Sequence, residues 1–185
     1  MKIVLCPNPF RDKGLKAAKS SETLLRAAGV HTECCFPFPV DKNNIGEIDP
    51  TIKIKEMKTE LPDADFLVCF GGDGTILHAA KDASSFGVPI VGVNMGSVGF
   101  MAELEQNELS QLTRLVSGEY TLENRMLLDV RVIRDGRVIF RSVALNDAVI
   151  TKGAVARVID LQVYGDKILI SNIFGDGVIL ATPTG

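Results

Sequence analysis

Residues 71–75 read Gly-Gly-Asp-Gly-Thr and lie between an apolar run, FLVCF at 66–70, and a helix-like segment, ILHAAK at 76–81. A buried strand, a glycine turn and a helix start in this order form a phosphate-binding turn, because the backbone N–H groups of the turn and of the helix start converge on an anion. Asp73 is unexpected there, since its carboxylate repels phosphates. It is therefore a candidate proton acceptor, metal partner or ligand of a sugar hydroxyl. The stretch indicates phosphoryl transfer near a hydroxyl group.

The apolar runs around this turn predict a parallel sheet that is covered on both faces. Strands are expected over residues 2–6, 30–36, 66–70 and 88–93, and helices over residues 13–28 and from the glycine turn to about residue 84. The polar residues 41–62 are expected to form a loop with at most one exposed helix. Alternating strands and helices are typical of a Rossmann-like α/β domain, which binds ligands beyond the carboxyl ends of its strands. The turn at 71–75 and a second glycine-rich turn at 94–100 should therefore line one crevice.

The period of the apolar pattern changes beyond residue 120, from the helical period to a period of two. Asp135-Gly136 is a hairpin signal, and a second turn is predicted at Gly165-Asp166. We predict a Rossmann-like nucleotide-binding domain over residues 1–103, a connecting helix over 104–120, and the beginning of an all-β domain, antiparallel and sandwich-like, over 121–185. So few strands leave an open edge and a thin core, so the 185 residues are expected to be less than a complete functional chain.

The composition excludes several classes of protein. The 20 basic and 23 acidic residues give a net charge of -3, and no basic run suits nucleic acid or a membrane surface. The mean hydropathy is +0.20, and no stretch approaches the roughly 18 consecutive apolar residues of a membrane span. The four cysteines lie in apolar runs without metal-ligand spacing. We interpret them as buried thiols of a cytoplasmic protein.

Several short motifs follow one another in the order and spacing of the NAD kinase family, which this sequence resembles. They are GGDGTIL at 71–77, NMGSVGF at 94–100, RMLL at 125–128, LND at 145–147 and DGVILATPTG at 176–185. The family shares its GGDG signature with diacylglycerol and sphingosine kinases and with phosphofructokinases. The resemblance implies phosphorylation of the adenosine ribose 2′-hydroxyl of NAD to give NADP, with ATP or, in some members, polyphosphate as the donor. It also implies a divalent metal, Mg²⁺, carried by the donor phosphates rather than by protein ligands, and a homodimer or homotetramer.

The resemblance also implies roles for individual residues. Asp73 corresponds to the catalytic aspartate of the family, and Gly72 and Gly74 to the turn around the phosphates. Further substrate or nucleotide contacts are implied at His78, Asn94, Asn146, Asp147, Arg157, Asp176 and Thr184. The pair at 146–147 is usually Asn-Glu in the family, and the shorter Asp147 implies a weaker or water-mediated hydrogen bond to a ribose hydroxyl.

Other interpretations stay open at this point. A diacylglycerol-type lipid kinase shares the GGDGT turn, although such kinases follow it with a different loop from residues 94–100. A truncated, non-catalytic nucleotide-binding fragment is an alternative of another class. Asn146 and Asp147 also suit a plain turn, His78 also suits a helix surface, and Arg157 also suits a solvated strand position.

Overall fold

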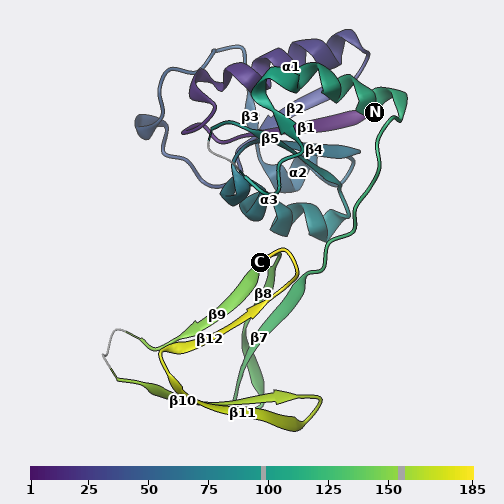
Figure 1. Cartoon of the computed structure of the whole chain (residues 1–185). Coiled ribbons are helices and arrows are strands. Elements are labelled where there is room, and N and C mark those ends of the chain that lie inside the picture. The colour runs from purple at the N-terminus through teal and green to yellow at the C-terminus, as the bar shows by residue number, and fades with distance from the viewer. Residues whose placement is uncertain (97–98, 154–156) are drawn as a thin grey trace. The chain divides into compact units, whose positions relative to one another are not determined.

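The structure is a computed structural model that describes residues 1–96, 99–153 and 157–185 (Figure 1). The chain divides into two compact units, Met1–Glu123 and Asn124–Gly185. Each unit has its own architecture, Rossmann-like α/β in the first and small antiparallel sheets in the second. The predicted fold class is confirmed in both respects.

A six-stranded parallel sheet forms the centre of the first unit, with the strand order β3-β2-β1-β4-β5-β6. The strands are β1 (Lys2–Pro7), β2 (His31–Cys35), β3 (Ile54–Lys55), β4 (Phe66–Gly71), β5 (Ile90–Asn94) and β6 (Leu104–Glu105). The helices are η1 (Lys13–Leu15), α1 (Lys16–Ala27), η2 (Lys42–Asn44), α2 (Met57–Glu60), α3 (Asp73–Phe86), η3 (Gln106–Thr113) and α4 (Arg114–Ser117). The strand order reverses between the neighbours β1 and β4. Ligands of doubly wound sheets bind at this switch point, beyond the carboxyl ends of the strands.

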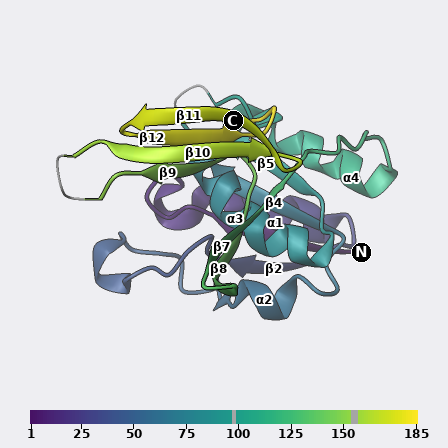
Figure 2. The ribbon, with the colours of Figure 1, turned by 90° about the horizontal axis from the view of Figure 1, so that it is seen from below.

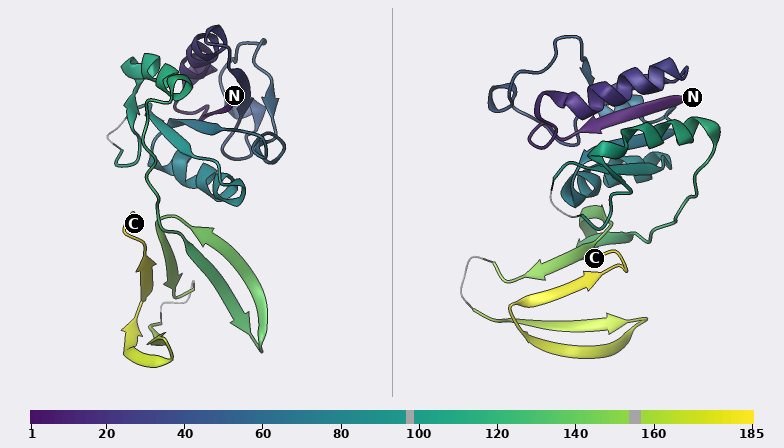
Figure 3. Two further views of the ribbon diagram at one scale, coloured as in Figure 1. Left: turned by 90° about the vertical axis from the view of Figure 1, so that its right-hand side faces the viewer. Right: turned by 45° about the horizontal axis from the view of Figure 1, so that its top comes forward.

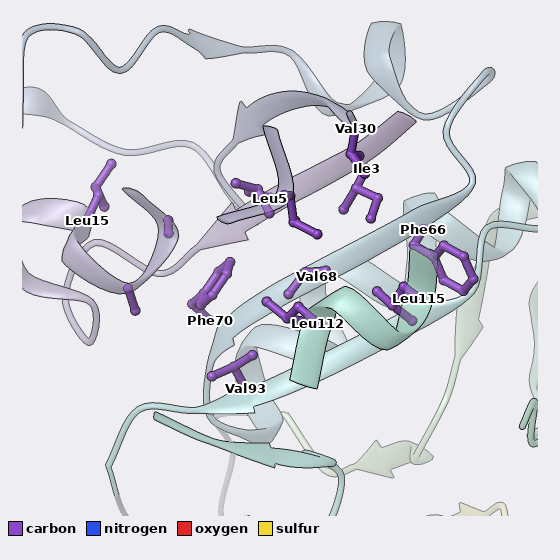
Figure 4. Packing of buried hydrophobic residues seen from close by; sticks show 13 residues of the cluster. Ile3, Leu5, Leu15, Val30, Phe66, Val68, Phe70, Val93, Leu112 and Leu115 are labelled. Carbon is purple, nitrogen blue, oxygen red and sulfur yellow. The ribbon is translucent and has the colours of Figure 1, made fainter. Parts of the chain in front are cut away.

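Both faces of the sheet are buried, which explains the continuous apolar runs of its strands. Successive side chains of a strand point to opposite faces, and one face packs against α1, η3 and α4 (Figure 4). The labelled core of that face consists of Ile3, Leu5, Leu15, Val30, Phe66, Val68, Phe70, Val93, Leu112 and Leu115. Helix α3 lies across the strands in the view from below (Figure 2) and contacts β4 and β5. Gly92 permits this close packing, because a Cβ there would lie 2.6 Å from Ile76 Cδ1.

The segment predicted as one connecting helix, residues 104–120, has a different structure. It begins with the short strand β6, whose Leu104 and Glu105 pair with Val93 and Asn94 of β5, and continues as η3 and α4. A capping box between Glu105 and Glu108 starts η3. The apolar spacing alone could not reveal a two-residue edge strand.

The described residues of the second unit form three two-stranded antiparallel sheets (Figure 3). They pair β7 (Leu128–Arg134) with β8 (Arg137–Ala144), β9 (Asp147–Thr151) with β12 (Gly177–Ala181), and β10 (Ile159–Gly165) with β11 (Ile168–Gly175). Asp135 and Gly136 form the predicted hairpin turn, with φ values of 50° and 72°. The second turn is Asp166–Lys167, with φ values of 49° and 70°, one residue later than predicted. Strand β9 was not predicted, because its partner β12 lies far along the chain.

The four cysteines are all buried in the first unit and all free. The prediction of buried thiols is therefore confirmed. In the part of the chain that the structure describes, no helix has the length and apolar content needed to cross a bilayer.

Candidate active site

A cavity of about 410 Å³ lies at the switch point of the sheet, where β1 and β4 end. It is lined by Asn8, Arg11, Phe38, Gly72, Asp73, Gly74, Thr75, His78 and Gly99. The glycines come from both glycine-rich turns, as the sequence predicted for the crevice. Asp73 supplies its one carboxylate among the described lining residues.

The GGDGT turn joins the buried strand β4 directly to helix α3. Gly72 is the N-cap residue of this 14-residue helix, and its carbonyl accepts the N–H of Thr75 at 2.8 Å. Gly71 must be glycine, because a Cβ there would lie 2.1 Å from Thr75 Oγ1. The turn therefore presents the positive end of a helix dipole to the cavity, which favours a negatively charged ligand.

The carboxylate of Asp73 is held by the second glycine-rich turn. It accepts the backbone N–H of Phe100 at 3.1 Å and that of Met101 at 3.2 Å. Gly99 leaves the space for this contact, since a Cβ there would lie 2.6 Å from Asp73 Oδ1. A carboxylate has about four acceptor positions, so two remain for a ligand. The carboxylate is thus oriented and still able to accept a hydroxyl proton.

The loop after β1 is fastened to the GGDGT turn by Asn8. The backbone N–H of Asn8 donates to the carbonyl of Phe70 at 2.9 Å, and its side-chain Nδ2 donates to Thr75 Oγ1 at 3.0 Å. The carbonyl of Asn8 in turn accepts the N–H groups of Arg11 and Asp12. These bonds fix the backbone of the whole loop relative to the start of α3.

Three aromatic rings lie against one another, and two of them line the cavity. The rings of Phe38 and His78 meet edge to face with centroids 5.3 Å apart, and Phe10 stacks on Phe38 at 6.3 Å. Of these three residues, Phe38 and His78 are among the described residues that line the cavity. His78 therefore lines the same cavity as Asp73, and its ring contacts that of Phe38. These two rings give the cavity an apolar surface that suits a base or a sugar.

Asn94 lies at the carboxyl end of β5 and is 5% exposed. Its Nδ2 donates to both carboxylate oxygens of Glu105, at 3.1 and 3.3 Å, and its Oδ1 accepts the N–H of Gly96 at 3.3 Å. Asn94 is not among the described residues that line the cavity. In this structure it holds β6 against β5 and begins the second glycine-rich turn.

In the second unit, the LND and TPTG motifs pack against each other. The carbonyl of Asn146 accepts the N–H of Thr182 at 2.7 Å, and Thr182 Oγ1 donates to the carbonyl of Leu145 at 2.5 Å. A Cβ on Gly185 would lie 2.5 Å from the Asn146 carbonyl oxygen. Asn146 Oδ1 is buried and has no hydrogen-bond partner among the described residues. Burying such an acceptor unpaired is costly, which makes it a candidate for a hydrogen bond with a ligand or a water molecule.

The other predicted site residues of the second unit lie within these two motifs or between them in the sequence. The Asp176 carboxylate forms an ion pair with Lys152 at 2.7 Å, and Thr184 Oγ1 accepts from Arg125 at 3.4 Å. Asp147 and Arg157 are exposed, the first at the start of β9 and the second just before β10. The two units thus carry two separate sets of predicted site residues.

Comparisons with known proteins agree on one family. The family model of the ATP-NAD kinase N-terminal domain matches residues 15–120. The NAD kinase of Acetivibrio thermocellus is 33% identical over 186 residues, which cover all of this chain and 62% of that protein. The NAD kinase of Caldanaerobacter subterraneus is 36% identical over 185 residues and is covered to 63%, and that of Symbiobacterium thermophilum is 43% identical over 124 residues.

The chain belongs to the NAD kinase family. It spans somewhat less than two thirds of the length of the first two relatives. The structure is similar in fold to yeast NADH kinase, solved with NADH, with a TM-score of 0.79 at 22% identity over all of this chain and 58% of that one.

Three residues that line the cavity of this NAD kinase family member were not predicted from the sequence, namely Asn8, Arg11 and Phe38. The available signal was position. Asn8 and Arg11 follow β1 and Phe38 follows β2, so all three lie beyond carboxyl ends of parallel strands, where ligands bind.

Proposed function

We propose that this protein is an NAD kinase, which transfers the terminal phosphoryl group of ATP or polyphosphate to the adenosine ribose 2′-hydroxyl of NAD. The observation that carries the proposal is Asp73, a carboxylate in the glycine turn at the N-terminus of α3 that is oriented by backbone N–H groups at the end of the second glycine-rich turn. Membership of the family supports the choice of substrate.

Asp73 would accept the proton of the acceptor hydroxyl. A carboxylate is a weak base at neutral pH, but the hydroxyl proton leaves late in a loose phosphoryl-transfer transition state, so that orientation of the hydroxyl contributes most. The amides of Phe100 and Met101 hold the carboxylate in one orientation for this task. The backbone of Gly72 and Gly74 would bind the phosphates.

The residues present fit a magnesium ion that arrives with the donor. Among the described residues there is no group of three or more His, Cys, Asp or Glu side chains that could hold a metal. Mg²⁺ is commonly bound through substrate phosphates and keeps several waters, so the ion would be carried by the donor phosphates beside Asp73 rather than by protein ligands. When bound, the ion would offset phosphate charge.

Residues of the second unit would bind the nucleoside parts of NAD. Asn146 supports this assignment through its unpaired buried Oδ1. By motif, Asp147, Asp176 and Thr184 would contribute further hydrogen bonds, and Arg157 would contact the nucleotide. We also propose a cytoplasmic location and a homodimer or homotetramer, which light scattering of the full-length protein would test.

The decisive experiment offers the full-length protein Mg-ATP with either NAD or diacylglycerol and measures phosphate transfer to each. We expect NADP to form and diacylglycerol to remain unmodified. Transfer to diacylglycerol alone would establish the lipid kinase, and NAD binding without turnover would establish a non-catalytic binding protein. Either result would overturn the proposal.

A further inference from the structure

Arg11 is a positively charged residue of the cavity, and no described acidic residue forms an ion pair with it. Its backbone is fixed by the bond from its N–H to the carbonyl of Asn8 at 3.0 Å. Its side chain is exposed and lines the cavity together with Asp73 and the Gly72–Thr75 turn. No other described residue forms an ion pair or a side-chain hydrogen bond with it. The Arg11 guanidinium is therefore available to bind a ligand in the cavity.

The guanidinium also reaches the second glycine-rich turn. A Cβ on Gly96 would lie 3.8 Å from Arg11 Nη1, and any side chain there would extend toward the guanidinium. Arg11 therefore lies between the two glycine turns. Its five N–H donors form a planar fork that matches phosphate oxygens two at a time.

We infer that Arg11 binds the phosphates of the phosphoryl donor and positions them for transfer, an inference that rests on the proposed function. The charge balance of the cavity supports it. Asp73 repels phosphates, and among the described lining residues Arg11 is the one with a permanent positive charge. A donor must bring its terminal phosphorus to the hydroxyl that Asp73 orients. A fixed cation close to that carboxylate would therefore favour binding of the phosphates, in addition to the magnesium that they carry.

The chemistry of the acceptor argues for the donor rather than for NAD. NAD also carries two phosphates, but they are attached to the 5′-carbon of the ribose, across the sugar from the 2′-hydroxyl. The donor phosphates, in contrast, adjoin the reacting hydroxyl itself. Arg11 shares a cavity of only about 410 Å³ with Asp73, which favours contact with the phosphates that react.

The test compares Arg11→Ala and Arg11→Lys with the control Lys16→Ala, which removes the same charge from an exposed position at the start of α1. Steady-state kinetics give the KM for ATP and for NAD separately. We expect Arg11→Ala to raise the KM for ATP about ten- to a hundred-fold, the range of a lost charge-assisted hydrogen bond, with the KM for NAD unchanged. The KM of Arg11→Lys for ATP should lie between those of the wild type and Arg11→Ala, because lysine keeps the charge but lacks the planar set of N–H donors. Lys16→Ala should behave as the wild type.

Calorimetric binding of inorganic tripolyphosphate with magnesium, without NAD, gives a readout that does not need turnover. Arg11→Ala should weaken this binding by a similar factor, and the thermal unfolding midpoint should not move. If Arg11→Ala matches Lys16→Ala in both measurements, or raises only the KM for NAD, the inference is overturned. If the wild type binds tripolyphosphate through Arg11 yet never phosphorylates NAD, the proposed function fails and the phosphate site stands.

Discussion

The backbone N–H of Phe100 donates to the carboxylate of Asp73 at 3.1 Å, although the two residues are 27 positions apart. This bond joins the turn after β4 to the turn after β5. It has two consequences, since it orients the carboxylate and also fixes the distance between the turns. The orientation of the Asp73 carboxylate and the local backbone structure therefore depend on the same atoms.

Replacing Asp73 by Asn should abolish most NAD phosphorylation while leaving the fold intact. The amide has a similar shape, but it cannot take a proton and offers one oxygen to the two N–H groups of Phe100 and Met101. We expect kcat to fall about 10²–10⁴-fold and the free energy of unfolding to fall by about 1 kcal/mol. Saturation kinetics and urea denaturation measure the two effects. Asp82→Asn, farther along α3, is the matched control, and a variant at 73 with the turnover of that control would exclude the role of Asp73.

Replacing Gly99 by Ala should reduce turnover without replacing any ionisable group. The new Cβ would lie 2.6 Å from Asp73 Oδ1, so the carboxylate or the backbone of the turn must move. Gly46→Ala is the control, because a Cβ at Gly46 has no neighbour within 4 Å. We expect kcat to fall about ten-fold or more for Gly99→Ala, because small displacements of a positioned group are costly, and to stay unchanged for Gly46→Ala. Equal kcat values for both variants would contradict the contact.

Asn8 and Thr75 should be energetically coupled. Their side-chain hydrogen bond is 3.0 Å long and ends on the hydroxyl of Thr75, a residue that is 2% exposed. A double-mutant cycle of Asn8→Ala and Thr75→Val, followed by urea denaturation, should give a coupling of about 1 kcal/mol. Additive losses would mean that the loop after β1 is held by its backbone bonds alone.

The buried thiols should resist modification in the native protein. Burial raises the pKa of Cys35 to about 12 and raises the pKa of Cys6 and Cys34 as well. Because the thiolate is the reactive form, a thiol reagent at about pH 8 should modify no cysteine before unfolding and all four in urea. Modification of the native protein at the rate of a free thiol would contradict the burial.

The same shifts predict a loss of stability at alkaline pH. The unfolded thiols ionise near their ordinary pKa of 9.0, whereas the folded thiols keep their protons. The folded state then binds more protons, so the free energy of unfolding falls as pH rises above that value, by up to about 1.4 kcal/mol per pH unit for each thiol. Urea denaturation across this range measures the slope. Replacing Cys35 by Ala should make the slope shallower.

Thr182 should connect stability and NAD binding in the second unit. Its hydroxyl donates to the carbonyl of Leu145 and accepts the N–H of Thr184 at 3.1 Å, so it joins the TPTG and LND motifs. Thr182→Val keeps the shape and removes both bonds. We expect a loss of about 1–3 kcal/mol in the free energy of unfolding and a raised KM for NAD. The exposed Thr151→Val in β9 should change neither, and a Thr182→Val protein indistinguishable from it would refute the connection.

The class of each unit and the central turn can be predicted from the amino-acid sequence. Strands are predicted by apolar residues that alternate with polar ones or that follow one another without interruption, and glycine and proline mark the turns between them. Asp135-Gly136 forms a hairpin turn because both residues readily adopt positive φ. The order of short motifs indicated the family, because each motif is a local string of residues.

The set of residues around Asp73, in contrast, depends on the tertiary fold. Asn8 and Thr75 are 67 positions apart, and nothing in either local stretch indicates that the ends of β1 and β4 are neighbours. The strand order places them together, because pairing of β1 with β4 buries both strands in the middle of the sheet. The same strand order places β6 beside β5, so that Asn94 donates a hydrogen bond to Glu105. It also places Arg11, which follows β1, in the lining of the cavity. Side-chain roles of this kind follow from packing over long sequence separations, which no local pattern encodes.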